Sequence, residues 1–355
     1  MDLILKDKVN SCGDFSLIQS SLHYVSNSIL YKYPSEKIIE LKDYWGVHFD
    51  LFLFNVFTNR SNNKFYDYLG NEICEFDKRN FYHIFASNDF IYYDRTSKKT
   101  KYNDSNIFES KIGGNFLSGK SLFIPKDNLI ISLNYTNAET PWQYNLAELG
   151  TYTPLHKQEQ KPYAVRKFLG LWQNDLLIAC DGGLLLAINQ ESGVLTRQWQ
   201  GLPKGADDYL QSVLRVQLPQ QGYVYQLNLA KTRIEAFFLH YYFYIDLESG
   251  TMHLINCKDN LKKYQIEQYK YSSAYAEDAT HLYTKVTYDK GTSGTDYIPT
   301  GLCAFNKQTF VIDWQYRFDQ HDDYLKTDNP QLSDNKLYQL SADKVLYIFE
   351  KEEDV

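Results

Sequence analysis

The chain has 355 residues, with 37 lysine and arginine against 44 aspartate and glutamate residues and a formal net charge of −7. This length allows a large core, and the acidic balance argues against nucleic acid as the direct ligand, because no basic face is expected. Aromatic residues make up 16% of the chain, which favours β-strands.

The N-terminal residues 1–15 do not resemble a secretory signal, because acidic and basic residues interrupt the apolar run within six positions. No apolar stretch reaches the length of about 18 residues that a membrane span needs. The five cysteines are odd in number, and no pair has C-x-x-C spacing. We therefore expect a cytoplasmic protein with reduced thiols, in which Cys180, Cys257 and Cys303 are small core residues.

Strand patterns separated by polar turns begin near residue 15. Leu22–Val25, Ile29–Tyr33 and Ile38–Leu41 predict strands of a first sheet, and three similar sheets follow up to residue 148. Residues 147–162 show no clear pattern and are expected to form a loop. Helical spacing is found only at Asp207–Leu214, which allows two turns at most.

The clearest unit is Phe168–Trp199, which reads as four short strands joined by three tight turns. Asp181-Gly182-Gly183 supplies residues that tolerate positive φ, as a short hairpin requires. The inner strands, Leu176–Cys180 and Leu184–Ile188, have no polar face, so both of their sides should be covered. Four antiparallel strands in about 32 residues are typical of one blade of a β-propeller.

The same unit resembles the PQQ-like propeller repeat. The resemblance lies in the Asp-Gly turn at 181–182, the strand end Ala187-Ile188-Asn189, the Ser192-Gly193 turn and the closing Trp199. This copy has Asn189 where the repeat usually has aspartate and Ser192 where it has threonine, and Trp199 lies two residues late. The resemblance implies a fold and no activity, because propellers host many functions.

Two later segments repeat the last turn of this unit. Ile245–Gly250 and Phe305–Phe310 align with Ile188–Gly193, except that phenylalanine replaces the final glycine in the last copy. Lys336–Leu340 and Val345–Glu350 read as closing strands, and we expect them to complete the first blade and so remove an exposed sheet edge.

The sequence therefore predicts an all-β fold, a single β-propeller domain over residues 1–355. Seven blades of four antiparallel strands fit the pattern best, and six or eight also fit it. The expected blades cover about residues 15–45, 46–79, 80–117, 118–148, 163–200, 205–258 and 270–318, with closing strands at 335–351.

One segment, Gly114–Ser121, matches the P-loop formula G-x-x-x-x-G-K-[ST]. A P-loop needs a strand before it and a helix after it, so that loop amides and the helix N-terminus hold the phosphates. Here the preceding residues are polar and charged, and the following ones form a strand pattern cut by a proline. We therefore predict a hairpin loop between blades and no nucleotide site.

Other chemistry has little support in the sequence. The eight histidines are scattered: His240 is expected to be a packed core residue, and His321-Asp322-Asp323 a solvated turn with too few ligands for a metal. Quinoprotein dehydrogenases share the PQQ-like repeat, but they are generally exported and much longer, and this chain lacks the vicinal cysteines that some of them carry. We expect no cofactor, no metal and no enzymatic activity.

The favoured function is binding of another protein by a propeller that is monomeric when free, without nucleic acid or membrane. Tyrosine-rich and acidic loops make suitable contact surfaces, although each residue could equally serve packing or a solvated turn. The candidate partner-binding residues are Asp207, Asp208, Tyr209, Tyr297, Asp322, Asp323 and Tyr324, and Tyr223 and Tyr225 also lie in or beside predicted loops.

In general character the chain is similar to the propeller immunity proteins of bacterial toxin systems: it has one PQQ-like blade, degraded repeats and an acidic, aromatic-rich composition. That likeness implies direct neutralisation of one specific toxin by binding. Two alternatives stay open. One is a scaffold propeller, and the other is a propeller hydrolase or lyase with an axial site, which would need Asp, Glu and His residues convergent at the inner strand ends.

Overall fold

The computed structural model divides into two compact units, Met1–Lys111 with Tyr316–Val355, and Ile112–Gln315. The structure describes residues 3–41, 46–49, 53–57, 62–77, 79–86, 89–154, 158–200, 225–269, 275–288, 301–318, 329–341 and 343–352. None of the helices in these ranges has the length and apolar character of a membrane span.

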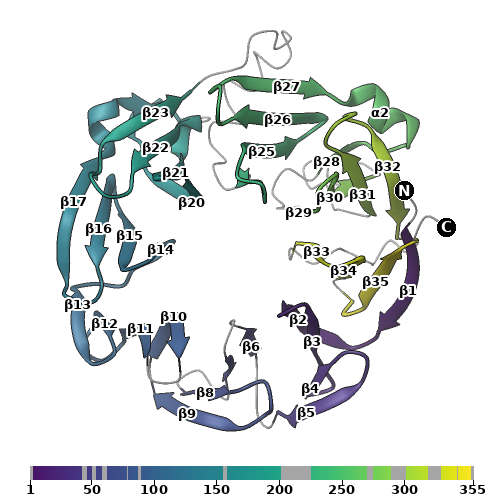
Figure 1. Ribbon diagram of the computed structural model, residues 1–355, viewed down its shortest axis with the longest axis horizontal. Helices are drawn as coiled ribbons and strands as arrows, with labels where there is room; N and C mark the ends of the chain where they lie inside the picture. The colour runs from purple at the N-terminus through teal and green to yellow at the C-terminus, as the bar shows by residue number, and fades with distance from the viewer. Residues whose placement is uncertain are drawn as a thin grey trace. The chain divides into compact units, whose positions relative to one another are not determined.

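The first unit contains four antiparallel sheets of four strands each (Figure 1). Three sheets use consecutive strands: β2 (Cys12–Ile18), β3 (Ser21–Ser26), β4 (Ile29–Lys32) and β5 (Glu36–Glu40); β6 (Gly46–Phe49), β7 (Phe54–Phe57), β8 (Asn62–Tyr66) and β9 (Glu72–Asp77); β10 (Arg79–Ala86), β11 (Asp89–Asp94), β12 (Lys99–Tyr102) and β13 (Ser105–Phe108). The fourth sheet has the order β1 (Leu3–Val9), β35 (Leu346–Lys351), β34 (Lys336–Leu340), β33 (Gln331–Ser333).

The second unit contains the other four sheets, again of consecutive strands (Figure 1). They are β14 (Phe116–Ser118), β15 (Ser121–Lys126), β16 (Leu129–Asn134) and β17 (Glu139–Asn145); β20 (Val165–Trp172), β21 (Asp175–Cys180), β22 (Leu185–Asn189) and β23 (Leu195–Trp199); β24 (Gln226–Leu227), β25 (Arg233–Phe238), β26 (Tyr241–Asp246) and β27 (Met252–Asn256); β28 (Gln268–Tyr269), β30 (His281–Thr287), β31 (Gly301–Asn306) and β32 (Ile312–Arg317). In the last sheet β29 (Ala276–Glu277) also pairs with β30.

Short elements connect some of these strands. They are η1 (Leu146–Leu149), the two-stranded sheet of β18 (Thr151–Tyr152) and β19 (Lys161–Pro162), η2 (Asp181–Gly183) and α2 (Lys258–Lys263). Residues 147–162, which show no clear pattern in the sequence, therefore include most of a 3-10 turn and the two short strands β18 and β19.

The sheets are the blades of an all-β propeller, as the sequence predicts. Seven of them are each built from one continuous stretch of the chain and correspond to the seven expected blades. The closing strands differ from the prediction: they do not complete the first blade but pair with β1 in a further sheet of their own. The first blade already has four strands, because β2 supplies its first one. Gly13 and a register shift between Cys12 and Asp14 obscure β2 in the sequence.

The fifth blade shows why its inner strands lack a polar face. β21 and β22 pair in register, with Leu176 opposite Ile188 and Leu177 opposite Ala187. Leu176 packs in a core shared with the β14–β17 sheet, and Leu177 packs in a core shared with the β24–β27 sheet. Both faces of the blade are therefore covered, as the uninterrupted apolar runs predict.

The turn aligned in three blades has the same hydrogen bonds in each copy, which confirms the alignment. The side-chain Oδ1 of Asn189 accepts from the backbone N–H of Ser192, and Asp246 does the same for Ser249. Asn306 accepts in the same way from the N–H of Thr309. An Asx turn of this kind fixes the tip of the hairpin with a local side-chain acceptor.

Two tryptophans on outer strands bind the turn of the next blade. The indole Nε1 of Trp142 donates to the Gln190 carbonyl, and Trp199 Nε1 donates to the Gly250 carbonyl, both at 3.0 Å. Gly193 has φ +71°, and a Cβ on it would lie 2.6 Å from the Trp142 ring. The close approach of the ring therefore requires glycine at this turn.

The third copy replaces both partners of this contact. Phe310 takes the position of the glycine, and β27, the outer strand of the preceding blade, has no tryptophan. Instead Asn260 of α2 donates through Nδ2 to the Phe310 carbonyl at 3.3 Å. The helix α2 thus takes over the bond that a tryptophan makes in the two preceding blades. The sequence did not predict this six-residue helix, and the expected turns at Asp207–Leu214 lie outside the described residues.

The cysteines allow a first prediction. Cys180, Cys257 and Cys303 are buried, as expected, as is Cys12, whereas Cys74 is partly exposed. Burial raises the pKa of the Cys180, Cys257 and Cys303 thiols, that of Cys257 to about 11. The thiolate is the reactive form of cysteine, and a raised pKa keeps these three residues in the thiol form at pH 8. A thiol reagent at that pH should therefore leave them unmodified in the native protein. Titration should reach five thiols only after unfolding; modification of any of the three before unfolding would contradict the expectation.

Candidate functional site

The residues predicted to contact a partner lie outside the part of the chain that the structure describes. This holds for Asp207, Asp208, Tyr209, Tyr297, Asp322, Asp323 and Tyr324, and also for Tyr223 and the His321-Asp322-Asp323 segment. Tyr225 is described and is buried; its ring packs edge-on against Phe243, with the centroids 5.9 Å apart. Of the two roles that the sequence leaves open for Tyr225, the structure shows packing, because it lies in the core between two blades.

The segment that matches the P-loop formula forms a β-hairpin. Leu117 and Ser118 of β14 pair with Leu122 and Ser121 of β15, so a strand follows the motif where a P-loop needs a helix. The predicted hairpin is confirmed, although it lies within one blade and not between two. Without a helix N-terminus, the backbone lacks the cradle that holds phosphates in P-loop proteins.

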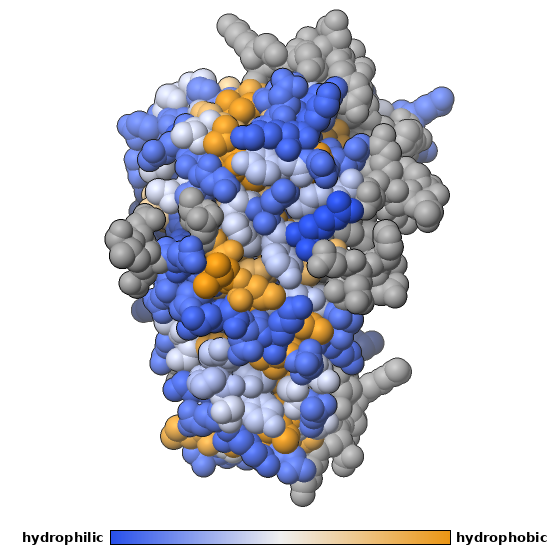
Figure 2. Space-filling view, turned by 90° about the vertical axis from the view of Figure 1, so that its right-hand side faces the viewer, coloured by the Kyte–Doolittle hydropathy of each residue, from blue (hydrophilic) through white to orange (hydrophobic). Residues whose placement is uncertain are grey.

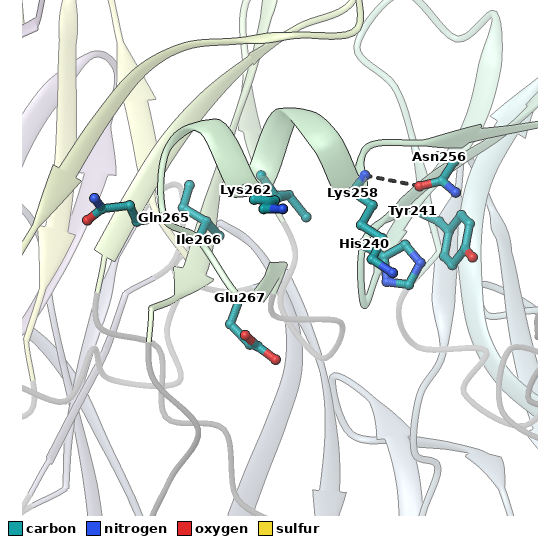
Figure 3. Close-up of a pocket in the computed structure, with 9 residues that line it drawn as sticks. His240, Tyr241, Asn256, Lys258, Lys262, Gln265, Ile266 and Glu267 are labelled. Atoms are coloured by element: carbon teal, nitrogen blue, oxygen red, sulfur yellow. Dashed lines mark hydrogen bonds between the residues drawn. The ribbon is translucent and has the colours of Figure 1, made fainter.

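A pocket of about 740 Å³ lies at one end of the sixth blade (Figure 3). We call it the α2 pocket, and its lining residues are His240, Tyr241, Asn256, Lys258, Leu261, Lys262, Gln265, Ile266 and Glu267. They come from the turn between β25 and β26, the end of β27, the helix α2 and the segment before β28. This volume falls in the range of about 300–1,000 Å³ that is usual for ligand sites.

Hydrogen bonds tie the walls of the α2 pocket together. The Cys257 N–H donates to the His240 carbonyl at 2.8 Å, and the Lys258 N–H donates to Asn256 Oδ1 at 3.0 Å. The Ile266 N–H donates to the Leu261 carbonyl at 2.9 Å, which folds the chain back under α2. The pocket is therefore preformed by the backbone, as small-molecule sites usually are.

The lining of the α2 pocket combines an apolar floor with a polar rim. Tyr241, Leu261 and Ile266 are buried, whereas Lys258 and Lys262 are exposed on α2. His240, which the sequence places in the core, is half-buried and lines the pocket. The centroid of its ring lies 4.0 Å from the centroid of the Tyr241 ring. In Figure 3 the Lys258 side chain extends from the start of α2 toward His240.

A second cluster of charged residues is buried between the sixth and seventh blades. Lys307 Nζ forms an ion pair with Glu277 Oε2 at 3.0 Å, and the side chains are 13% and 2% exposed. The other oxygen of Glu277 accepts from the Leu229 N–H. Tyr275 donates its hydroxyl to Glu235 Oε2 at 3.0 Å, and Glu235 is fully buried.

The environment of Glu235 favours its neutral form. Burial raises its pKa, the negative charge of Glu277 raises it further, and the pKa reaches about 7. The hydroxyl groups of Tyr242 and Tyr275 and the charge of Lys307 offset this only in part. Ionising the carboxyl would therefore place a poorly solvated charge in the core.

The neighbouring acids of the seventh blade are also bonded. Tyr283 donates its hydroxyl to Asp278 Oδ2 at 2.6 Å, and His281 Nε2 lies 2.8 Å from Asp313 Oδ2. Each of these carboxylates is held by a tyrosine, lysine or histidine. Among the described residues no three His, Cys, Asp or Glu side chains are grouped to hold a metal.

Comparison with known proteins identifies the fold. No family model matches the sequence, and no curated protein matches it. The crystal structure of the computationally designed Ika8 protein matches with a TM-score of 0.56 and 8% identity, over 96% of each chain. The fold is a β-propeller. The crystal structure of BamB from Moraxella catarrhalis matches over 99% of this chain and 100% of its own at 12% identity, with a TM-score of 0.43.

Exposed apolar side chains lie at one end of three consecutive blades. Val194 follows the third strand of the fifth blade, Leu229 the first strand of the sixth, and Val311 the third strand of the seventh. Their exposed fractions are 59%, 72% and 41%. Because strands alternate in direction, turns after first and third strands share one end of a blade, so we call these three residues the turn-end residues. The α2 pocket is at the opposite end.

Sequence reasoning missed the α2 pocket and the buried ion pair. Lys258 and Lys262 are spaced i and i+4, which is the one signal that places them on a common helix face. This spacing covers one helical turn and comes directly after a strand, so the sequence alone does not indicate a helix there. Glu277 and Lys307 lie 30 residues apart, and their pairing depends on the strand order of the seventh blade.

Proposed function

We propose that this chain is a non-catalytic propeller that binds another protein through the turn end of its fifth to seventh blades. The observation that carries the proposal is the set of turn-end residues, one exposed apolar side chain on each of three consecutive blades. Single exposed apolar residues are common on protein surfaces, but here one occurs at the same end of each of three successive blades. Exposed polar residues such as Glu191 and Glu248 lie in the same set of turns.

This composition suits a protein interface, which combines apolar anchors with a polar surround. Full burial of a valine or leucine side chain contributes about 1.5–3 kcal/mol, so three such anchors give a useful share of a tight interaction. Figure 2 shows a face of the molecule that is mostly hydrophilic, with its hydrophobic residues in small separate patches. The net charge of −7 would favour encounter with a basic partner.

In its most specific form, the proposal is that the partner is a bacterial toxin and that the propeller neutralises it in the cytoplasm by direct binding. The general likeness of the sequence to propeller immunity proteins supports this form. An immunity protein needs tight and specific binding, and it needs no cofactor. A scaffold that holds a larger assembly together is the coarser alternative that the same turn-end residues would serve.

The test combines co-expression with a binding measurement. Co-expression should rescue cells from one toxin encoded beside this chain and from no unrelated toxin, and the purified pair should bind with a Kd of about 1 nM or lower. Serine at Val194, Leu229 and Val311 together should weaken the complex at least about a hundredfold, since burial of a valine or leucine side chain contributes about 1.5–3 kcal/mol.

A matched variant separates the interface from general exposure. Leu69→Ser removes an apolar side chain that is 82% exposed in the other unit, and it should leave the affinity unchanged. An unchanged affinity in the triple serine variant would contradict the proposed interface. Recovery of a metabolic or cytoskeletal assembly, with no toxin encoded nearby, would replace the neutralising role with the scaffold role.

A further inference from the structure

We infer that the α2 pocket binds a small organic anion, a carboxylate or phosphate carried on an aromatic or apolar body. The inference does not depend on the proposed function, because the pocket is at the opposite end of the sixth blade from the turn-end residues. It rests on the size of the pocket, its floor and the charges at its rim.

The floor accounts for the apolar part of the ligand. Tyr241, Leu261 and Ile266 are buried and belong to, or border, the cores of the sixth and seventh blades. Beside them the imidazole of His240 lies tilted by 38° against the Tyr241 ring. A planar or aliphatic body can therefore bury its surface against side chains that packing already holds in place.

The rim accounts for the anion. Lys258 and Lys262 lie four residues apart on α2, and both are exposed residues that line the pocket. Like charges at this spacing destabilise a helix, and an anion bound between them would reverse that effect. In a chain with a net charge of −7, two lysines facing one pocket are a local excess of positive charge.

The opposite wall restricts the ligand further. Glu267 lines the pocket beyond the end of α2, and in Figure 3 its carboxylate lies on the side away from Asn256. A second negative group there would be repelled, whereas a neutral hydrogen-bond donor would be accepted. The ligand should therefore carry its charge at one end only, which favours an amide-containing carboxylate over a dicarboxylate.

Two probes test this chemistry by isothermal titration at about 50 mM salt. Hippurate has a benzoyl ring, an amide and one carboxylate, and phenyl phosphate has the ring and a phosphate. We expect saturable binding of hippurate, binding of phenyl phosphate at the same pocket, and affinity at least roughly tenfold weaker for the uncharged hippuramide and for inorganic phosphate, which each lack one half of the recognised group.

Variants of exposed residues locate the binding without disturbing the fold. Lys258→Gln and Lys262→Gln should each weaken hippurate binding about three- to fivefold, and Glu267→Gln should strengthen it by a similar factor. Lys263→Gln is the matched control, because Lys263 is on the same helix and lies over the Tyr264 ring outside the pocket lining. Binding should also weaken at about 300 mM salt.

Three results would overturn the inference. One is no saturable binding of either aromatic anion up to about 10 mM, well above the weak Kd of a small ligand. Another is unchanged affinity in the Lys258→Gln, Lys262→Gln double variant, with thermal unfolding confirming that it is folded. The third is an equal loss of affinity in Lys263→Gln, which would show a general effect of charge.

Discussion

Replacing Lys307 with methionine should lower the free energy of unfolding by about 3–5 kcal/mol. Methionine keeps much of the length of the side chain but removes the charge that pairs with Glu277 and the donor to the Asp278 carbonyl. Glu277, whose side chain is 2% exposed, would then be a buried carboxylate without its counter-ion. Urea denaturation of both proteins at pH 7 measures the loss.

A double-mutant cycle separates the pair from the individual side chains. Glu277→Gln with Lys307→Met should recover much of the stability, because the unpaired charge is gone, and the coupling between the sites should be in the range of about 0.5–3 kcal/mol or above. As a control, Lys37→Met breaks an exposed pair with Glu40 and should cost about 0.5 kcal/mol or less. A loss in Lys307→Met as small as this would refute the buried-pair argument.

The second large effect concerns pH. Glu235 has a pKa of about 7 in the folded protein against an ordinary value of 4.5, so the folded state binds its proton more tightly than the unfolded state. Its contribution to stability is therefore fully present below pH 4.5 and is lost as the pH rises through 7. The difference of about 2.5 units corresponds to about 3 kcal/mol.

Glu235→Gln should remove this dependence, because glutamine stays neutral. Relative to the parent protein, the variant should gain about 3 kcal/mol in unfolding free energy between pH 4.5 and pH 8. Comparing the two proteins at each pH cancels the titration of all other groups. Glu248→Gln, in an exposed turn of the same blade, should show no such gain. A parallel pH profile for Glu235→Gln and the parent protein would show that Glu235 does not titrate in this range.

Strand patterns with a local cause could be predicted from the sequence. The fifth blade was predicted nearly to the residue, because the Asp181-Gly182-Gly183 turn and the two apolar strands each require their own conformation. In the structure Gly182 and Gly183 have φ values of +69° and +72°, as predicted for this turn. The three Asx turns could be aligned for the same reason, since each acceptor bonds within its own turn.

Features that depend on distant partners could not be predicted. The first strand of the first blade, Cys12–Ile18, has no clear strand pattern because it mixes glycine and aspartate with its apolar residues. Asn260 of α2 makes the hydrogen bond to the next blade that a tryptophan makes in the two preceding blades. Nothing in the sequence around Asn260 indicates that it bonds to Phe310, fifty residues later. Glu235 lies on a strand beside hydrophobic residues, and sequence alone could not show that Tyr275, forty residues later, binds it.

The pairing of β1 with β35 has a consequence for the order of synthesis. Leu3 is made 343 residues before Leu346, and at about 5–20 residues per second this takes roughly 20–70 s. Through that interval the nascent β1 has no partner strand. Its Lys6-Asp7-Lys8 charges and the register shift between Leu5 and Asp7 are features that keep a lone strand from joining other chains. The first unit can therefore be completed only after residue 351 has been added.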